Sequence, residues 1–388
     1  MEVPEGWESF YPENAVLLLL QTIYRLKQSA MAFWKQLLMC MKSMRLTRSK
    51  ADPCLYYAWT ALGLVILVSW IDDNLIIGSQ AAVDHTKAQL MSRFDCEDCG
   101  ELNEYIGCKL THLEGGAIKF TQDVLLQSFR DEFELNLEKK VKTPSVPGSV
   151  LTRGNPDVVL EPARQTYLRS GIGKMIHMMQ WSQPEISHSV RDMAKHMQDG
   201  HEAAIDAMHR TMEYCVGTPL RGLTLRPDTE WDGTKDFKFR ISGRSDSDYA
   251  KDPETRRSVS GTQVSVNGLV TQFCSATQKY TTLSVTEAEQ GAAVTCAQDM
   301  IYQKNVLESM GLQVELPMIL EVDNKGTVDL ANDWRVGGQT RHVDVRQNLL
   351  RELKEDGILI IRWISGDEND TQEFGGTFVR ETCKDLLW

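Results

Sequence analysis

The chain has 388 residues, of which 42% are hydrophobic and 25% are charged. This composition excludes a disordered tail and a fibrous repeat, and a single core stops growing near roughly 250 to 300 residues, so we expect a soluble globular protein of two or three domains. The formal net charge of −12 excludes a protein whose whole surface binds nucleic acid, but it is compatible with a local basic patch that does so.

Nine cysteines, an odd number, are spread through a chain that begins without a secretory leader pattern. We therefore expect reduced thiols and an intracellular protein, either cytoplasmic or nuclear. Cys96 and Cys99 form a single Cys-x-x-Cys pair. Without a second pair at zinc-ribbon spacing, these cysteines are more typical of residues that fill apolar positions than of a metal site.

The segment from Asn14 to Lys50 contains seven basic residues and no acidic one, with aromatic residues between them. Apolar residues at helical spacing predict that this segment is rich in helix. Such a patch could meet phosphates and bases through Lys27, Gln28, Trp34 and Lys35. A solvated helix face on an acidic protein explains the same charges equally well.

The run from Leu55 to Ile71 imitates a membrane span, because it is apolar and as long as the shortest transmembrane helices, at about 17 residues. It is nevertheless rich in β-branched and aromatic residues, is divided by a turn at Thr60–Gly63, and ends in Asp72-Asp73 rather than in basic anchors. We predict a buried β-hairpin and no membrane partner.

The next segments alternate between strand, helix and loop. The periodicity predicts a strand at Leu75–Ile77, a helix over Ala82–Phe94 with Leu90 and Met91 directed inward, and a strand within Gly100–Leu110. Prolines and glycines make residues 143–162 a linker, residues 167–217 are predicted to be mostly helical, and residues 218–233 form a second break.

The last part of the chain has the clearest pattern. A half-buried strand, Phe237–Ser245, leads to Asp246, and a helix that begins at the capping box Ser284–Glu287 carries Glu289. A buried strand, Met318–Val322, ends at Asp323. The remaining predicted elements are strands Val259–Val266, Leu269–Ser275 and Ile358–Ile364, a helix over Arg341–Asp356, and a stop for the first helix at Gly311.

Asp246, Glu289 and Asp323 can meet if the two strands are adjacent and the helix packs across the end of their sheet. Three carboxylates repel one another unless a cation neutralises them, and hard oxygen ligands favour Mg²⁺ or Mn²⁺. Two such ions roughly 4 Å apart would support phosphodiester hydrolysis. The alternative is three ordinary surface acids.

Four motifs in this part resemble copia-type ribonuclease H domains, in the order in which that family carries them. They are GRSDSDYAKDPETRRSVSG (243–261), LSVTEAE (283–289), VDN (322–324) and TRHVDVR (340–346). The resemblance implies that Asp246, Glu289 and Asp323 are catalytic metal ligands and that the substrate is the RNA strand of an RNA–DNA hybrid. The family's fourth carboxylate falls where this chain has Thr371-Gln372, with Asp370 and Glu373 as the candidates to replace it.

Upstream motifs resemble copia-type reverse transcriptases. They are YRLKQS (24–29), SKADPCLY (49–56) and GELNEYIG (100–107), and WIDD (70–73) stands where that family carries its aromatic-x-Asp-Asp polymerase motif. This implies that Asp72 and Asp73 are catalytic metal ligands. The family's fingers and first palm aspartate would precede residue 1, so we expect little or no DNA synthesis from this chain alone.

Together these patterns predict an α/β (α+β) chain in which a truncated reverse-transcriptase palm and thumb remnant precedes a ribonuclease H-like mixed-sheet domain. The expected boundaries are 1–112 for the palm remnant, 113–235 for a thumb or connection region, and 236–388 for the ribonuclease H-like domain. The favoured function is that of a retrotransposon-derived polymerase and ribonuclease H fragment. The alternative is a decayed or domesticated remnant that binds nucleic acid without catalysis.

Overall fold

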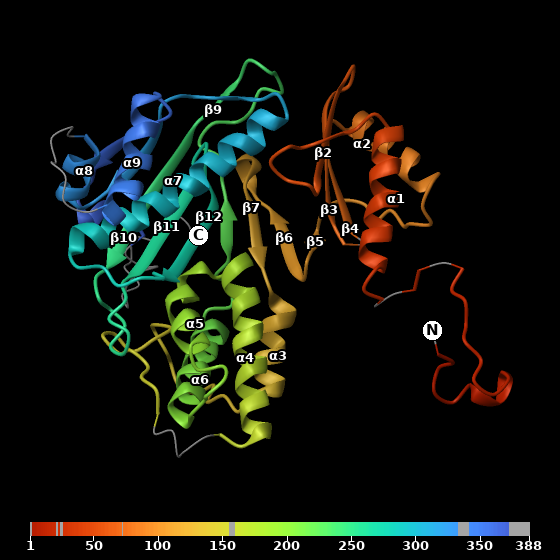
Figure 1. Cartoon of the computed structure of the whole chain (residues 1–388), viewed down its shortest axis with the longest axis horizontal. Coiled ribbons are helices and arrows are strands. Elements are labelled where there is room, and N and C mark those ends of the chain that lie inside the picture. Colours follow the sequence, from red (N-terminus) through yellow and green to blue (C-terminus); the bar gives the residue numbers. More distant parts are fainter. Residues whose placement is uncertain are drawn as a thin grey trace. The chain divides into compact units, whose positions relative to one another are not determined.

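The computed structural model describes residues 2–20, 22–23, 26–71, 73–154, 160–332 and 341–371, with the backbone alone for 341–347. The chain divides into two compact units, Met1–Cys99 and Gly100–Trp388, which are described separately below (Figure 1). Both units mix helices and sheets, so the predicted α/β class is confirmed. The predicted boundaries 1–112, 113–235 and 236–388 stay predictions.

The first unit is a four-stranded antiparallel sheet with two helices. The strands follow the order β1-β2-β3-β4, and Leu37 and Met41 from α1 share a core with Tyr56 and Leu67 from the sheet. The hairpin predicted for Leu55–Ile71 is confirmed as β2 and β3. The elements are a short 3-10 turn (Glu8–Phe10), α1 (Ser29–Ser43), β1 (Thr47–Arg48), β2 (Leu55–Thr60), β3 (Gly63–Trp70), β4 (Asp73–Gly78) and α2 (Gln80–Met91).

Three local predictions for the first unit are wrong. The helix begins only at Ser29, so the described residues between 14 and 28 are not helical. Leu90 is buried but Met91 is 46% exposed, because neighbouring helical residues point about 100° apart. Cys96 and Cys99 are exposed free thiols rather than residues at apolar positions.

The second unit begins with a small antiparallel sheet and a helical layer. The single strand predicted within Gly100–Leu110 is a hairpin, because Ile106 and Gly107 both have positive φ, as a two-residue turn requires. Phe129, Leu168 and Met212 lie in the helical core. The elements are β5 (Glu104–Tyr105), β6 (Cys108–His112), a 3-10 turn (Glu114–Gly116), β7 (Ile118–Thr121), α3 (Asp123–Glu132), α4 (Pro162–Trp181), a 3-10 turn (Pro184–Ile186), α5 (Ser187–Ala194), α6 (Glu202–Gly217) and β8 (Leu223–Leu225).

β8 lies inside the break predicted for residues 218–233 and pairs with β7. Gly222 permits this approach, because a Cβ at this position would lie 2.3 Å from the carbonyl oxygen of Phe120. The remaining predictions for this region are confirmed, since residues 162–217 are mostly helical and the described residues of 143–161 form no helix or strand.

The five-stranded sheet that follows carries the candidate site. Its order is β12-β11-β10-β14-β15, antiparallel across β10–β12 and parallel across β10, β14 and β15, and α7 lies across it (Figure 1). Gly243 lets α7 approach, because a Cβ there would lie 2.5 Å from the Met300 sulfur. The elements are β9 (Lys238–Phe239), β10 (Ile241–Asp248), β11 (Val259–Val266), β12 (Leu269–Thr277), α7 (Val285–Ser309), β13 (Gln313–Val314), β14 (Met318–Val322), α8 (Lys325–Asn332), α9 (Arg341–Glu355), β15 (Leu359–Trp363) and a 3-10 turn (Gly366–Glu368).

The strands and helices predicted for residues 237–364 are confirmed to within a few residues, with one exception. The single strand predicted at Phe237–Ser245 is divided at Arg240 into β9 and β10, which belong to different sheets, and neither β13 nor α8 was predicted. Within the described ranges, no helix combines the length and the apolar character needed to cross a membrane.

Candidate metal centre

Two of the predicted carboxylates come from neighbouring strands. β10 and β14 run parallel, and Ser245 opposite Val322 is the last pair in their register. The next residue on each strand is a candidate, Asp246 on β10 and Asp323 after β14, so both carboxylates emerge at the same edge of the sheet. β10 itself continues to Asp248, three residues beyond the predicted strand end at Ser245.

The third carboxylate is brought to this edge by the start of α7. Ser284 caps the helix, since its Oγ accepts a hydrogen bond from the Glu287 N–H at 3.1 Å. Glu287 in turn accepts one from the Leu283 N–H at 2.8 Å, which completes the predicted capping box one residue upstream of the usual position. Glu289 then lies in the second turn, where its Oε1 accepts a hydrogen bond from the Ser247 N–H at 3.1 Å.

One oxygen from each of Asp246, Glu289 and Asp323 lies within 4.8 Å of the others. Asp246 is only 8% exposed and Glu289 only 4%. In the described part of the chain, Glu289 Oε2 has no hydrogen-bond partner. The structure therefore brings together the three residues that the sequence pattern selects.

Burial and mutual repulsion change the acidity of the cluster. Burial, followed by the nearby Asp323 carboxylate, raises the pKa of Asp246 to about 7. Burial, followed by Asp246, raises the pKa of Glu289 to about 9. A divalent cation would relieve both effects, because its charge offsets the repulsion between the carboxylates and it can take the unpartnered Glu289 oxygen as a ligand. The all-oxygen donor set fits Mg²⁺ or Mn²⁺.

Trp363, at the end of β15, was not selected from the sequence. Its indole N–H donates to the Asp323 carbonyl oxygen at 3.0 Å, and the ammonium of Lys325 lies 4.7 Å from the centre of its ring. The ring is 46% exposed beside the carboxylates. The only signal in the sequence for this contact with Asp323 is that a tryptophan lies at the end of a predicted strand.

The segment that follows β15 is tied to the same strands. Arg244 donates to Glu321 at 2.9 Å and to Asp370 at 2.7 Å, and Asn369 Nδ2 donates to the Ser245 carbonyl oxygen at 3.0 Å. Asp370 is therefore an ion-pair partner of Arg244 and is not part of the carboxylate group. The other candidate, Glu373, and the family position itself, Gln372, lie outside the described residues.

Of the two polymerase-type aspartates in the first unit, the structure describes one. Asp73 is exposed at the start of β4, opposite Trp70, while Asp72 lies outside the described residues. Among the carboxylates that the structure describes, Asp73 belongs to no group of three that could hold a metal ion.

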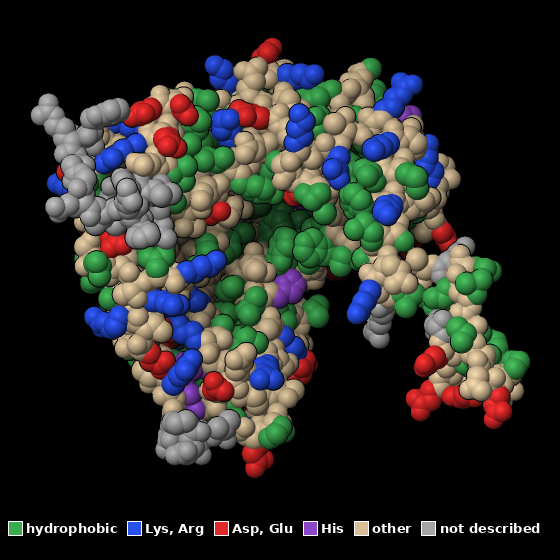
Figure 2. Space-filling view, viewed as in Figure 1, with side chains coloured by type: hydrophobic (Ala, Val, Ile, Leu, Met, Phe, Trp, Pro, Cys, Tyr) green, Lys and Arg blue, Asp and Glu red, His purple; other side chains and the backbone are tan. Residues whose placement is uncertain are grey.

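The predicted nucleic-acid contacts on α1 and just before it are accessible. Lys27, Gln28 and Lys35 are exposed, and Trp34 is half-buried with the Arg48 guanidinium 5.6 Å from its ring centre. Figure 2 shows Lys and Arg side chains gathered on one face of this unit.

Comparison with known proteins extends the sequence resemblance over the whole chain. Residues 1–147 match the family model of the reverse transcriptase (RNA-dependent DNA polymerase). The whole chain is 27% identical to the retrovirus-related Pol polyprotein from transposon TNT 1-94 of Nicotiana tabacum, and 94% of it is 24% identical to that from transposon RE1 of Arabidopsis thaliana. Over its whole length, the chain is similar to copia-type retrotransposon polyproteins. It spans only 29% and 24% of these two relatives' lengths.

Solved ribonuclease H structures are also among the proteins that this chain resembles. The N-terminal RNase H domain of a Mycobacterium tuberculosis protein is 12% identical and covers 36% of this chain and 91% of its own, with a TM-score of 0.28. LC11-RNase H1 in complex with an RNA/DNA hybrid is 12% identical and covers 38% of this chain and 94% of its own, with a TM-score of 0.26. Scores this low add no support, so the ribonuclease H-like assignment rests on the sheet order and the motifs in sequence.

Proposed function

We propose that this copia-type chain hydrolyses the RNA strand of RNA–DNA hybrids at the cluster formed by Asp246, Glu289 and Asp323. The observation that supports this most strongly is the convergence of three acids from three elements, two of them buried with raised pKa values. Natural folds rarely keep such a group without a cation, because the mutual repulsion and the lost hydration both cost stability.

Each residue has a defined part in this proposal. Asp246 and Asp323 would bind a divalent ion from one side, and Glu289 would bind it from the helix with the oxygen that Ser247 leaves unpartnered. The bound metal would supply an activated water and a positive charge beside the scissile phosphate. Trp363 would hold the backbone of Asp323, and thereby its carboxylate, in position.

The test is Mg²⁺-dependent cleavage of an end-labelled RNA–DNA hybrid by the whole chain. We expect cleavage of the RNA strand only, with single-stranded RNA and duplex DNA left intact. Asp246→Asn should abolish it, because the variant loses a metal ligand while keeping the side-chain volume. Undiminished cleavage by Asp246→Asn, or no cleavage by the parent chain in either Mg²⁺ or Mn²⁺, would overturn the proposal.

The second candidate is nucleic-acid binding without catalysis, which the exposed basic face of α1 favours. Lys35 lies on this helix beside Trp34, and Lys42 and Arg45 are exposed at its end. Binding through these cations should weaken steeply as salt rises. A salt titration with the Lys35→Ala variant tests this, and an absence of binding at low salt would dismiss it.

A further inference from the structure

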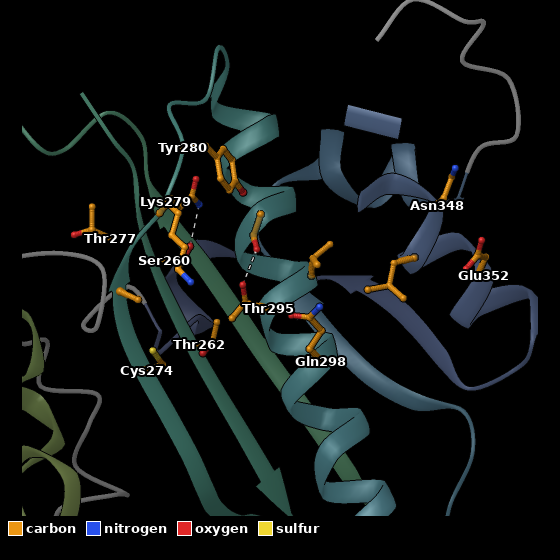
Figure 3. A pocket seen from close by; sticks show the side chains of 15 residues that line it. Ser260, Thr262, Cys274, Thr277, Lys279, Tyr280, Thr295, Gln298, Asn348 and Glu352 are labelled. Atoms are coloured by element: carbon orange, nitrogen blue, oxygen red, sulfur yellow. Dashed lines mark hydrogen bonds between the residues drawn. The ribbon is translucent and has the colours of Figure 1, made fainter. Parts of the chain in front are cut away.

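A cavity of about 700 Å³ lies beside α7 and contains none of the three carboxylates (Figure 3). We call it the α7 cavity. Its size falls within the range of roughly 300 to 1,000 Å³ that is usual for small-molecule sites. Its lining comes from β11, β12, the loop that precedes α7, α7 itself and α9.

The floor of the α7 cavity contains two buried polar atoms without a hydrogen-bond partner among the described residues, Thr262 Oγ1 and Gln278 Oε1. Thr262 is 1% exposed and Gln278 is 7% exposed. The amide of Gln278 is fixed in orientation, since its Nε2 donates to Ser260 Oγ and to the Ala288 carbonyl oxygen, each at 2.9 Å. Its Oε1 therefore has a fixed position, from which it can accept a hydrogen bond from a ligand.

The rim of the cavity is exposed and mostly uncharged. Thr295 and Gln298 project from α7, Asn348 and Glu352 lie across the helix on α9, and Lys279 stands at the loop end (Figure 3).

Tyr280 lies beside Lys279 and packs closely on the helix. A Cβ at Gly291 would lie 2.3 Å from the Tyr280 hydroxyl, so only glycine permits this placement of the ring. The lining of the cavity therefore combines an aromatic side chain, amide and hydroxyl groups, one cation at the loop end (Lys279) and one acid on α9 (Glu352).

This chemistry favours a ligand with N–H or O–H donors at one end and a negative charge at the other. The buried Gln278 carbonyl oxygen accepts from a base edge and repels an anion, and the Thr262 hydroxyl can accept from that edge or donate to it. Lys279 at the rim attracts a phosphate. Amide groups and an aromatic ring are the usual partners of unpaired bases.

We propose that the α7 cavity binds one unpaired nucleotide, with its base against Thr262 and Gln278 and its phosphate at Lys279. The choice of ligand class rests on the proposed function, but the binding itself requires no hydrolysis. The nucleotide could be free or could be a single-stranded extension of a hybrid, and the two sources are distinguished below.

The experiment measures binding to the whole chain by calorimetry in EDTA, where metal-dependent cleavage cannot occur. The probes are AMP, GMP, CMP and UMP, a blunt hybrid, and the same hybrid with a short single-stranded extension. We expect binding of a mononucleotide, or tighter binding of the extended hybrid than of the blunt one. Thr262→Val and Lys279→Ala should each weaken that binding about tenfold.

Thr224→Val is the matched control, because Thr224 on β8 is also buried, with an unpartnered hydroxyl, and does not line the α7 cavity. Both valine variants should fold at least as stably as the parent, since each removes an unpartnered buried hydroxyl and keeps the side-chain shape. Only Thr262→Val should alter binding.

Two results would overturn the nucleotide site. One is that no mononucleotide binds and the two hybrids bind equally well; the other is that Thr262→Val binds as tightly as Thr224→Val. Failure of the nuclease proposal is separate, since a chain that binds nucleotides through Thr262 yet cleaves no hybrid would lose only the hydrolytic function.

Discussion

Replacing Asp246 by Asn should stabilise the metal-free chain, and by more as pH rises. The pKa of Asp246 is raised to about 7 in the fold, against 3.8 ordinarily. Between these two values the folded chain keeps a proton that the unfolded chain has released. The stability of the parent therefore falls as pH rises through this window, and the loss is complete above about pH 7.

The difference between the folded and the ordinary pKa of Asp246 corresponds to a loss of about 4 kcal/mol at most in the parent's free energy of unfolding. The Asn variant carries no such carboxyl, so its advantage over the parent should grow across the window. For a domain of this size, the gap between the two melting temperatures should widen by roughly 5 to 10 °C between pH 5 and pH 8.

The assay is differential scanning calorimetry in EDTA at a series of pH values. Asp329→Asn, which changes an exposed acid on α8, is the matched control and should show a constant gap. Added Mg²⁺ should raise the melting temperature of the parent more than that of Asp246→Asn, because the ion binds only the intact cluster. If the difference between the melting temperatures of the parent and Asp246→Asn is the same at every pH, the raised pKa of Asp246 in the folded chain is refuted.

Three further substitutions test the surroundings of the cluster. Trp363→Phe keeps an aromatic ring but loses the N–H donor to Asp323, so a metal titration should show severalfold weaker metal binding at little cost in stability. An unchanged affinity for the metal would contradict the positioning role of Trp363. Lys195→Met removes the ion-pair partner of the buried Asp252, whose pKa the Lys195 hydrogen bond helps to hold below its usual range. The free energy of unfolding, measured with denaturant at neutral pH, should fall by about 2 kcal/mol, and this loss should fade as acid protonates Asp252. The same loss at every pH would contradict this. Ser284→Ala removes the cap of α7 and should cost about 1 kcal/mol in the same assay, whereas no change would show that the cap is dispensable.

Much of the last sheet could be predicted from the sequence because its determinants are local. Phe237, Phe239 and Ile241 alternate with polar residues and lead into β10, and the Ser284–Glu287 box marks the start of α7. The cluster of Asp246, Glu289 and Asp323 could be anticipated because strand ends and a helix start follow directly from such patterns.

What could not be predicted depends on partners that are distant in the sequence. β8 is a strand only because β7 offers it an edge, and Trp363 matters only because parallel pairing of β14 and β15 places it beside Asp323. The ion pair between Arg244 and Asp370 likewise joins two segments that carry no common motif.

The most direct test of the central claim compares hybrid cleavage by the parent chain with that by Asp323→Asn, Asp329→Asn and Gln372→Asp in Mg²⁺. We expect the parent and Asp329→Asn to cleave alike and Asp323→Asn to be inactive, while Gln372→Asp should be at least as active because it adds a carboxylate where the family carries one. If the parent cleaves no hybrid and Gln372→Asp restores cleavage, the site is disabled at this one position. Cleavage by Asp323→Asn at the parent's rate would contradict a metal centre at this cluster.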